Sequence, residues 1–292
     1  MTARRRPPAV IKLGGELLEE PVRLHRLARA LAHVADTEPL VVVHGGGREV
    51  DAEMACHGIP KRAVDGLRIT DGPTLDVVTG VLAGRVNTRL VAALGAAGAA
   101  AVGLTGADGG LVRVRRERRY RAADGTEVDL GFVGRPAGTG PPALLIDLLA
   151  AGYVPVVASL GVGAGGQIFN VNADTLAGFL AARIGARRLV IAGATAGVLD
   201  AAGRTIPTVD DGGIDMLIAG GQASAGMVAK LLACRAAIAG GAGEVAIVDG
   251  RRARRGVFER PAGRSRASGT VVVGATGPRS RRGAGTAREG GR

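Results

Sequence analysis

The stretches that decide the fold are AVIKLGG at residues 9–15 and LVVVHGGG at residues 40–47. Each is a short apolar run that stops at two or three glycines, which is typical of a buried strand ending in a tight turn. Between them, residues 22–35 carry leucines and alanines at the spacing of an amphipathic helix. This order predicts two parallel strands joined by a helix.

The same alternation continues along the chain. Further strands are predicted at 100–104, 154–158, 188–192 and 244–248, and further helices at 49–57, 87–97, 141–151, 175–184 and 227–239. Repeated strand–glycine–helix units are typical of a parallel sheet with helices on both faces. We therefore predict an α/β protein, a three-layer αβα sandwich around an open, mainly parallel sheet. Such sheets bind ligands at the carboxyl ends of their strands, where these glycines lie.

The net charge of +12 over 292 residues raises the question of a nucleic-acid partner. Most of this charge lies in three arginine-rich segments, because residues 1–9, 251–266 and 276–292 contribute +3, +6 and +4. The stretch 111–121 adds +5, which leaves −6 for the rest of the chain. We interpret these segments as solvated tails and a polar hairpin. A binding surface for nucleic acid or for an acidic partner is the alternative.

The cysteines and the apolar segments bear on the compartment. Cys56 and Cys234 are too few for a disulfide framework, and no second Cys–His pair accompanies Cys56 and His57 for a zinc site. The N-terminus lacks the apolar segment of a signal peptide. The uncharged run 90–107 is broken by Gly95, Gly98 and Gly103 and fits a helix end, a turn and a strand better than a membrane span. These features predict a cytoplasmic protein without a membrane anchor or a metal site of its own.

The glycines at the strand ends predict a phosphate-binding edge. Backbone N–H groups that no side chain obstructs bind phosphate, and Gly45, Gly46 and Gly47 lie between an apolar strand and a helix. Gly14 and Gly15 supply a second loop, although a tight turn alone would explain either one.

A GxGxxG motif at Gly161, Gly163 and Gly166 has a different interpretation. It leads into QIFNVN rather than into a helix, and no acidic residue follows at about 20 positions, as a dinucleotide site requires. We predict a hairpin turn there.

Lysine is scarce, since only Lys12, Lys61 and Lys230 occur among 38 basic residues. Lys12 precedes the first glycine turn, and Lys230 lies in AGMVAK near the start of a helix. Cationic groups on both sides of a transferring phosphoryl group stabilise its charge. The placement of these two lysines predicts such a pair, against the simpler interpretation of incidental surface residues.

A polar cluster, NVNADT at 170–175, brings together Asn170, Asn172 and Asp174. Asp174 suits the N-cap of the following helix, or else a side chain that positions a lysine or a metal-bound phosphate. Arg68, in DGLRITD, is a candidate fork for a substrate carboxylate.

These motifs, in this order, resemble the amino-acid kinase family and, within it, the acetylglutamate kinases. The resemblance runs from about residue 9 to residue 273, and GLRITD together with NVNAD is its most specific part. The matching stretches are IKLGG (11–15), VVHGGG (42–47), VDGLRITD (64–71), GRVNTRLVAAL (84–94), VGLTGADGGL (102–111), DLGFVG (129–134), AGYVPVV (151–157), NVNADT (170–175), GVLD (197–200) and GMVAK (226–230).

The resemblance implies ATP-dependent phosphorylation of the side-chain carboxylate of N-acetyl-L-glutamate to N-acetyl-L-glutamyl 5-phosphate, a step of arginine biosynthesis. It implies an N-terminal lobe over 9–175 that binds acetylglutamate and forms a dimer. Because the sequence lacks the long N-terminal helix of the family's arginine-inhibited hexamers, we expect a homodimer insensitive to arginine. A C-terminal lobe over 176–274 would bind ATP, with Mg²⁺ held through the nucleotide phosphates. Outside the lobes we predict a basic arm over 1–8 and a disordered arginine-rich tail over 275–292.

Roles for single residues follow from the same resemblance at the matching positions. Lys12 and Lys230 would stabilise the transferred phosphoryl group, and Asp174 would orient both lysines. The implied acetylglutamate-binding residues are Gly46, Gly47, Arg68 and Asn170. The implied phosphate- and nucleotide-binding residues are Gly14, Gly15, Gly197 and Met227.

Two departures from the family pattern leave alternatives open. Ala194 stands where an acidic residue is usual, and a single glycine precedes Met227 where two are common. Weak ATP binding or another donor would follow from these changes.

Two other functions stay open. A kinase of carrier-protein-linked aminoadipate or glutamate would use 111–121 to hold an acidic carrier. A regulatory or nucleic-acid-binding protein on a degenerate kinase scaffold is the alternative from another class.

Overall fold

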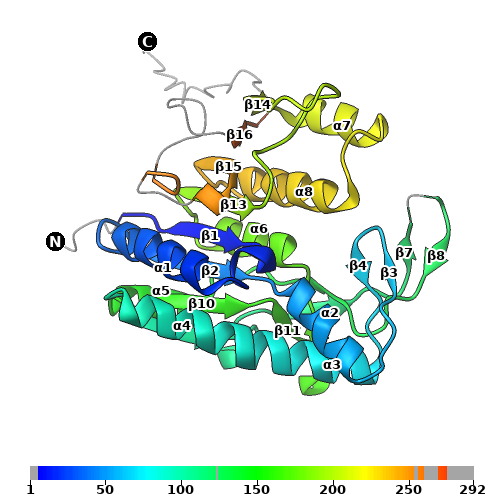
Figure 1. Cartoon of the computed structure of the whole chain (residues 1–292), viewed down its shortest axis with the longest axis horizontal. Coiled ribbons are helices and arrows are strands. Elements are labelled where there is room, and N and C mark those ends of the chain that lie inside the picture. Colours follow the sequence, from blue (N-terminus) through cyan, green and yellow to red (C-terminus); the bar gives the residue numbers. More distant parts are fainter. Residues whose placement is uncertain (1–5, 123, 253–255, 260–268, 275–292) are drawn as a thin grey trace, which may run out of the picture.

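A computed structural model of the chain describes residues 6–122, 124–252, 256–259 and 269–274. Its centre is an eight-stranded sheet that contains every strand predicted above (Figure 1). Neighbouring strands are parallel except β15 and β16, so the predicted open, mainly parallel sheet is confirmed. In spatial order the strands are β14 (Thr208–Val209), β16 (Gly269–Val272), β15 (Glu244–Asp249), β13 (Arg188–Gly193), β1 (Ala9–Leu13), β2 (Leu40–His44), β10 (Val154–Ala158) and β5 (Ala101–Leu104).

Helices cover both faces of this sheet. In β1, Ile11 and Leu13 point to the core under α1 (Pro21–Ala35) and α4 (Asn87–Ala96), whereas Val10 points to the core under α6 (Ala173–Arg183) and α8 (Ala225–Ala239). Side chains of a strand alternate between its faces, so the side chain of Lys12 lies on the α6 side. The helices of the described residues are α1 (Pro21–Ala35), α2 (Gly47–Cys56), α3 (Gly72–Thr79), α4 (Asn87–Ala96), α5 (Ala143–Ala150), α6 (Ala173–Arg183), α7 (Asp211–Ala219) and α8 (Ala225–Ala239).

One long helical segment joins α3 to α4 through a π-helical stretch, Gly80–Val86. The sequence predicted only its second half, because Gly80 and Gly84 interrupt the apolar pattern. The whole segment, Gly72–Ala96, is long and apolar enough to span a membrane by length and composition. Its buried apolar side chains, among them Val78, Leu90 and Leu94, belong to the core under the sheet, which accounts for that composition.

Small antiparallel pairs lie outside the main sheet. The GxGxxG segment turns between β11 and β12, with φ of 67° at Gly165 and 81° at Gly166, so the predicted hairpin is confirmed. The predicted tail (275–292) and the first five residues of the predicted arm (1–8) lie outside the described residues. The small strands are β3 (Ala63–Val64), β4 (Leu67–Arg68), β6 (Val114–Arg116), β7 (Tyr120–Arg121), β8 (Glu127–Val128), β9 (Gly134–Pro136), β11 (Leu160–Val162) and β12 (Ile168–Asn170).

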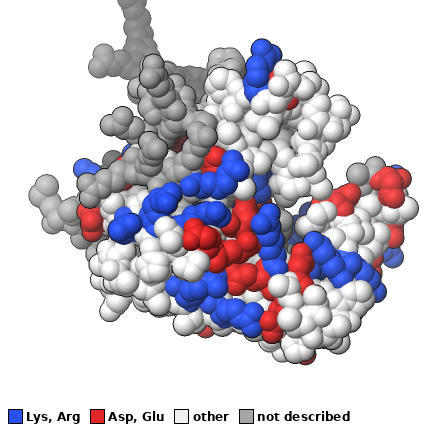
Figure 2. Space-filling view, in the orientation of Figure 1, with Lys and Arg blue, Asp and Glu red and all other residues white. Residues whose placement is uncertain are grey.

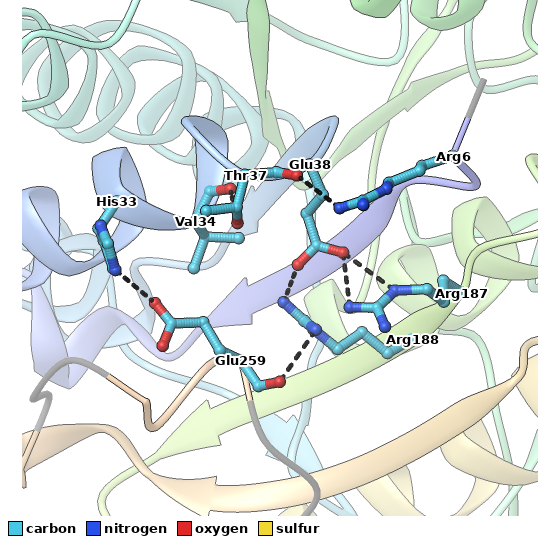
Figure 3. A network of polar contacts seen from close by, with 8 residues as sticks. All are labelled: Arg6, His33, Val34, Thr37, Glu38, Arg187, Arg188 and Glu259. Carbon is cyan, nitrogen blue, oxygen red and sulfur yellow. Dashed lines mark hydrogen bonds and ion pairs between the residues drawn. The ribbon is translucent and has the colours of Figure 1, made fainter. Parts of the chain in front are cut away.

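A buried ionic network lies at the amino ends of the central strands, opposite the glycines (Figure 3). Arg188, the first residue of β13, pairs with Glu38 from the connection before β2, and these residues are 3% and 7% exposed. Arg187 pairs with the other oxygen of Glu38 at 2.8 Å, and Arg188 donates to the carbonyl of Glu259 at 3.2 Å. His33 lies 3.6 Å from the Glu259 carboxylate. The network therefore ties α1 and the start of β2 to the second half of the chain.

Candidate active site

Two glycine loops meet at the carboxyl ends of β1 and β2. Gly14 and Gly15 follow β1, while Gly45 and Gly46 follow β2 and precede α2. A Cβ atom on Gly15 would lie 2.7 Å from the Cα atom of Gly46. A larger residue at position 15 would therefore push the loops apart, which explains the glycine there. The predicted phosphate-binding glycines lie side by side at one edge of the sheet.

Lys12, Asp174 and Lys230 converge beside these loops. The Nζ atom of Lys12, in β1, lies 2.7 Å from Oδ1 of Asp174, in the first turn of α6. Lys230, in α8, donates from Nζ to Oδ2 of Asp174 at 3.0 Å. The side chains of Lys12 and Asp174 are each 7% exposed. Two of the three lysines of the chain thus contact one buried carboxylate.

Burial and the lysines act on Asp174 in opposite directions. Burial favours the neutral carboxyl group, but the positive charges of Lys12 and Lys230 outweigh it and hold the pKa of Asp174 below its usual value. The carboxylate therefore stays ionised at neutral pH. It holds both ammonium groups at one place, and their combined charge exceeds its own, which favours an incoming anion.

Asn172, rather than Asp174, caps α6. Its Oδ1 atom accepts the backbone N–H groups of Asp174 and Thr175, each at 3.0 Å. The N-cap interpretation of Asp174 is therefore wrong. Because Asn172 satisfies the helix end, the carboxylate of Asp174 is left to face the two lysines.

The hairpin β3–β4 carries Arg68 to the second glycine loop. Asp65 and Gly66 form its turn with φ of 48° and 75°. The guanidinium of Arg68 pairs through Nη2 with Asp51 and donates to the carbonyl of Gly47 at 3.2 Å. The predicted carboxylate fork thus lies at the edge of the loop that contains the predicted substrate-binding glycines.

Asn170 joins the same group of residues through Thr70. Its Nδ2 atom donates to Oγ1 of Thr70 at 3.2 Å, and that hydroxyl donates to the carbonyl of Arg68 at 3.0 Å. Of the predicted substrate-binding residues, Arg68 therefore contacts Gly47 directly and Asn170 through Thr70, although the three come from distant segments.

The two predicted nucleotide residues of the second half lie on separate elements. Gly197 follows β13 with φ of 107°, and a Cβ atom there would lie 2.6 Å from Oγ1 of Thr270 in β16. Packing against β16 thus already requires a glycine at this position. Met227 lies half-buried in the first turn of α8, three residues before Lys230.

Several supporting residues were not predicted from the sequence, among them the fully buried His44. Burial lowers the pKa of His44 to about 4, so its ring is neutral. The amide of Asn87 donates to Nε2 at 3.0 Å, which leaves the proton on Nδ1 to bind the carbonyl of Gly45, also at 3.0 Å. The neutral imidazole therefore supports the second glycine loop. A histidine at the end of a buried apolar strand was the available signal for this role. Thr70 lies within the GLRITD motif, whereas Asp51 had no local signal.

Within the stretch 111–121, Arg116 and Glu117 pair with groups of their own region. Arg116 pairs with Asp129 at 2.9 Å and lies over the ring of Phe132, and Arg135 pairs with Glu117 at 2.7 Å. On the face drawn in Figure 2, basic and acidic side chains lie beside one another. This pattern is typical of solvated surface and favours the solvated-hairpin interpretation.

The hydrogen-bond donors at the carboxyl ends of β1 and β2 suit an anion. Within the ranges that the structure describes, no group of three or more His, Cys, Asp or Glu residues is arranged to hold a metal ion. Glycine N–H groups and lysine ammonium groups bind phosphate oxygens instead.

Comparison with known proteins gives consistent matches. The sequence model of the amino acid kinase family matches residues 7–249. An acetylglutamate kinase from Gluconacetobacter diazotrophicus is 40% identical over 247 residues, which are 83% of this chain and 78% of that protein. An acetylglutamate kinase from Methanopyrus kandleri is 45% identical over 243 residues, 82% of this chain and 94% of that protein.

Solved structures agree on the fold. An N-acetylglutamate synthase from Neisseria gonorrhoeae, complexed with coenzyme A and N-acetyl-glutamate, matches 92% of this chain with a TM-score of 0.76 and 26% identity. This chain spans only 59% of that synthase. A carbamate kinase from Giardia lamblia, bound to AMP-PNP, matches 91% of this chain and 99% of its own, with a TM-score of 0.61 and 14% identity.

Proposed function

Because this chain belongs to the amino acid kinase family, we propose that it transfers a phosphoryl group from ATP to the side-chain carboxylate of N-acetyl-L-glutamate. The products are ADP and N-acetyl-L-glutamyl 5-phosphate, as in arginine biosynthesis. The observation that carries the proposal is the pair Lys12 and Lys230 on the carboxylate of Asp174, beside two glycine loops.

The reaction needs charge neutralisation more than proton transfer. A carboxylate acceptor with a pKa near 4.3 is already ionised at neutral pH, so no general base is required. An oxygen of that carboxylate attacks the terminal phosphorus of ATP, and the bond to ADP breaks with its electrons on the departing oxygen. Lys12 and Lys230 stabilise the charge on the transferring group, and Asp174 keeps both ammonium groups in place.

The acceptor end of the site is formed by Arg68, Asn170 and the second glycine loop. The guanidinium of Arg68 binds the α-carboxylate of acetylglutamate while Asp51 holds it in position. Asn170 donates to the substrate, and Gly46 and Gly47 approach it through their backbone N–H groups.

The donor end is formed by Gly14, Gly15 and the segments that follow β13 and precede Lys230, including Gly197 and Met227. Mg²⁺ enters on the nucleotide phosphates and lowers their negative charge. In this proposal, residues 9–175 bind acetylglutamate and form a cytoplasmic homodimer, and residues 176–274 bind ATP.

The proposal is tested by trapping the product. With ATP, Mg²⁺ and hydroxylamine, the full chain should release ADP and form an equal amount of the hydroxamate of N-acetylglutamate, because hydroxylamine captures acyl phosphates. Glutamate and aspartate serve as matched acceptors and should give little hydroxamate, since they lack the acetyl group. ADP release without hydroxamate, or a faster reaction with glutamate than with acetylglutamate, would contradict the proposed substrate.

A further inference from the structure

Glu16 directly follows the first glycine pair and turns its carboxylate back over it. A Cβ atom on Gly14 would meet both carboxylate oxygens of Glu16, so this carboxylate lies directly against Gly14. The Oε1 atom of Glu16 accepts the backbone N–H of Ala194 at 3.1 Å. Ala194 is the residue after β13, the strand that neighbours β1 in the sheet. The carboxylate therefore spans from one strand end to the next.

The same carboxylate shares its surroundings with Lys230. A Cβ atom on Gly193 would lie 3.4 Å from Oε1 of Glu16 and 3.6 Å from Cε of Lys230. The two side chains thus approach the same glycine from different elements. A negative group lies within the part of the site that the donor phosphates would enter.

A carboxylate oxygen and a phosphate oxygen compete for the same kind of donor. Backbone N–H groups at glycine-rich strand ends bind either anion. We propose that Glu16 is an internal anion of the donor site, which occupies the N–H of Ala194 and sets the affinity for the nucleotide, so that the donor phosphates bind only after its carboxylate rotates away. This inference rests on the proposed function, because it takes a nucleotide phosphate as the ligand.

In this proposal, Glu16 lowers the affinity for the nucleotide through its charge rather than through its shape. A carboxylate left beside a polyphosphate repels it, whereas an amide of the same size does not. Glu16→Gln keeps an oxygen that can accept the N–H of Ala194, so the turn retains its contact, and only the negative charge is lost. The variant therefore separates competition by charge from simple bracing of the turn.

The test is isothermal titration of the full chain with ATP and Mg²⁺, and separately with inorganic tripolyphosphate. Glu16→Gln should bind both ligands roughly tenfold more tightly than the wild type. Glu19→Gln is the matched control, because Glu19 lies three residues after Glu16 and 3.6 Å from Arg48. The dissociation constants of Glu19→Gln should equal those of the wild type. Circular dichroism and the thermal midpoint report whether each variant is folded.

The possible outcomes distinguish failure of the proposed role of Glu16 from failure of the proposed donor site. Unchanged binding of both ligands by Glu16→Gln would contradict competition between the Glu16 carboxylate and phosphate, and would leave Glu16 with only a structural role in the turn. Weaker binding would also contradict it, and would indicate that the carboxylate assists binding of the metal-bound donor. If the wild type forms the hydroxamate while either result is found, only the role of Glu16 fails. If neither protein binds ATP or tripolyphosphate, both the donor site and the role of Glu16 fail.

Discussion

Replacement of Lys230 by alanine is expected to lower kcat by roughly 10²- to 10³-fold. Lys230 contacts Asp174 in the structure, and in the proposed reaction its ammonium group also stabilises charge that appears on the transferring phosphoryl group. Such an interaction acts in the transition state more than on the bound substrates, so the KM values of ATP and acetylglutamate should stay within about threefold. Initial rates of hydroxamate formation measure all three constants.

A matched control for this variant lies on the same helix. Arg235→Ala removes a cation of α8 that pairs with Asp215 at 2.6 Å, away from the glycine loops. Its kcat should stay within about twofold of the wild type, because its ion-pair partners, Asp211 and Asp215, are on α7. If Lys230→Ala turned over as fast as Arg235→Ala, Lys230 would have no role in the phosphoryl transfer.

Replacement of Glu38 by alanine is expected to lower the free energy of unfolding by about 3–5 kcal/mol. Glu38 pairs with Arg188, which is 3% exposed at the start of β13 (Figure 3). Removal of the carboxylate leaves a buried guanidinium without its counter-charge, which costs far more than an exposed pair contributes. Urea denaturation followed by circular dichroism gives the change in the free energy of unfolding.

Arg204→Ala serves as the control for the ionic network. Arg204 pairs with Asp200 at 2.9 Å, but its side chain is 80% exposed. Its removal should cost less than about 1 kcal/mol. Equal losses in the two variants would mean that burial at the amino ends of β1 and β13 adds nothing to the strength of the Glu38–Arg188 pair.

The central sheet was predictable because its signals are local. Each of the six predicted strands is a short apolar run, and a buried parallel strand needs no partner-specific side chains. The strands β14 and β16 were missed. β14 has only two residues, and β16 follows an arginine-rich segment, so neither shows a clear pattern. Their place in the sheet depends on pairing with each other and with β15.

The residues of the candidate site that could be predicted from the sequence include its two lysines and the glycines at the strand ends. Lys12 and Lys230 stood out because lysine is rare in this chain, and the structure brings both to Asp174. Asp51 was not predictable, since it meets Arg68 across 17 positions and two different elements. Nor did the sequence show that Asn172 would cap α6, because Asn172 and Asp174 both suit a helix start. The choice between them depends on the lysines that approach from β1 and α8.

The most direct test of the central claim, that Asp174 holds two lysines for phosphoryl transfer, is the kcat of Asp174→Asn in the hydroxamate assay. The amide keeps the shape of the carboxylate but carries no charge to hold Lys12 and Lys230. With circular dichroism like that of the wild type, kcat should fall roughly 100-fold or more. A folded Asp174→Asn protein with a kcat within about threefold of the wild type would contradict the account.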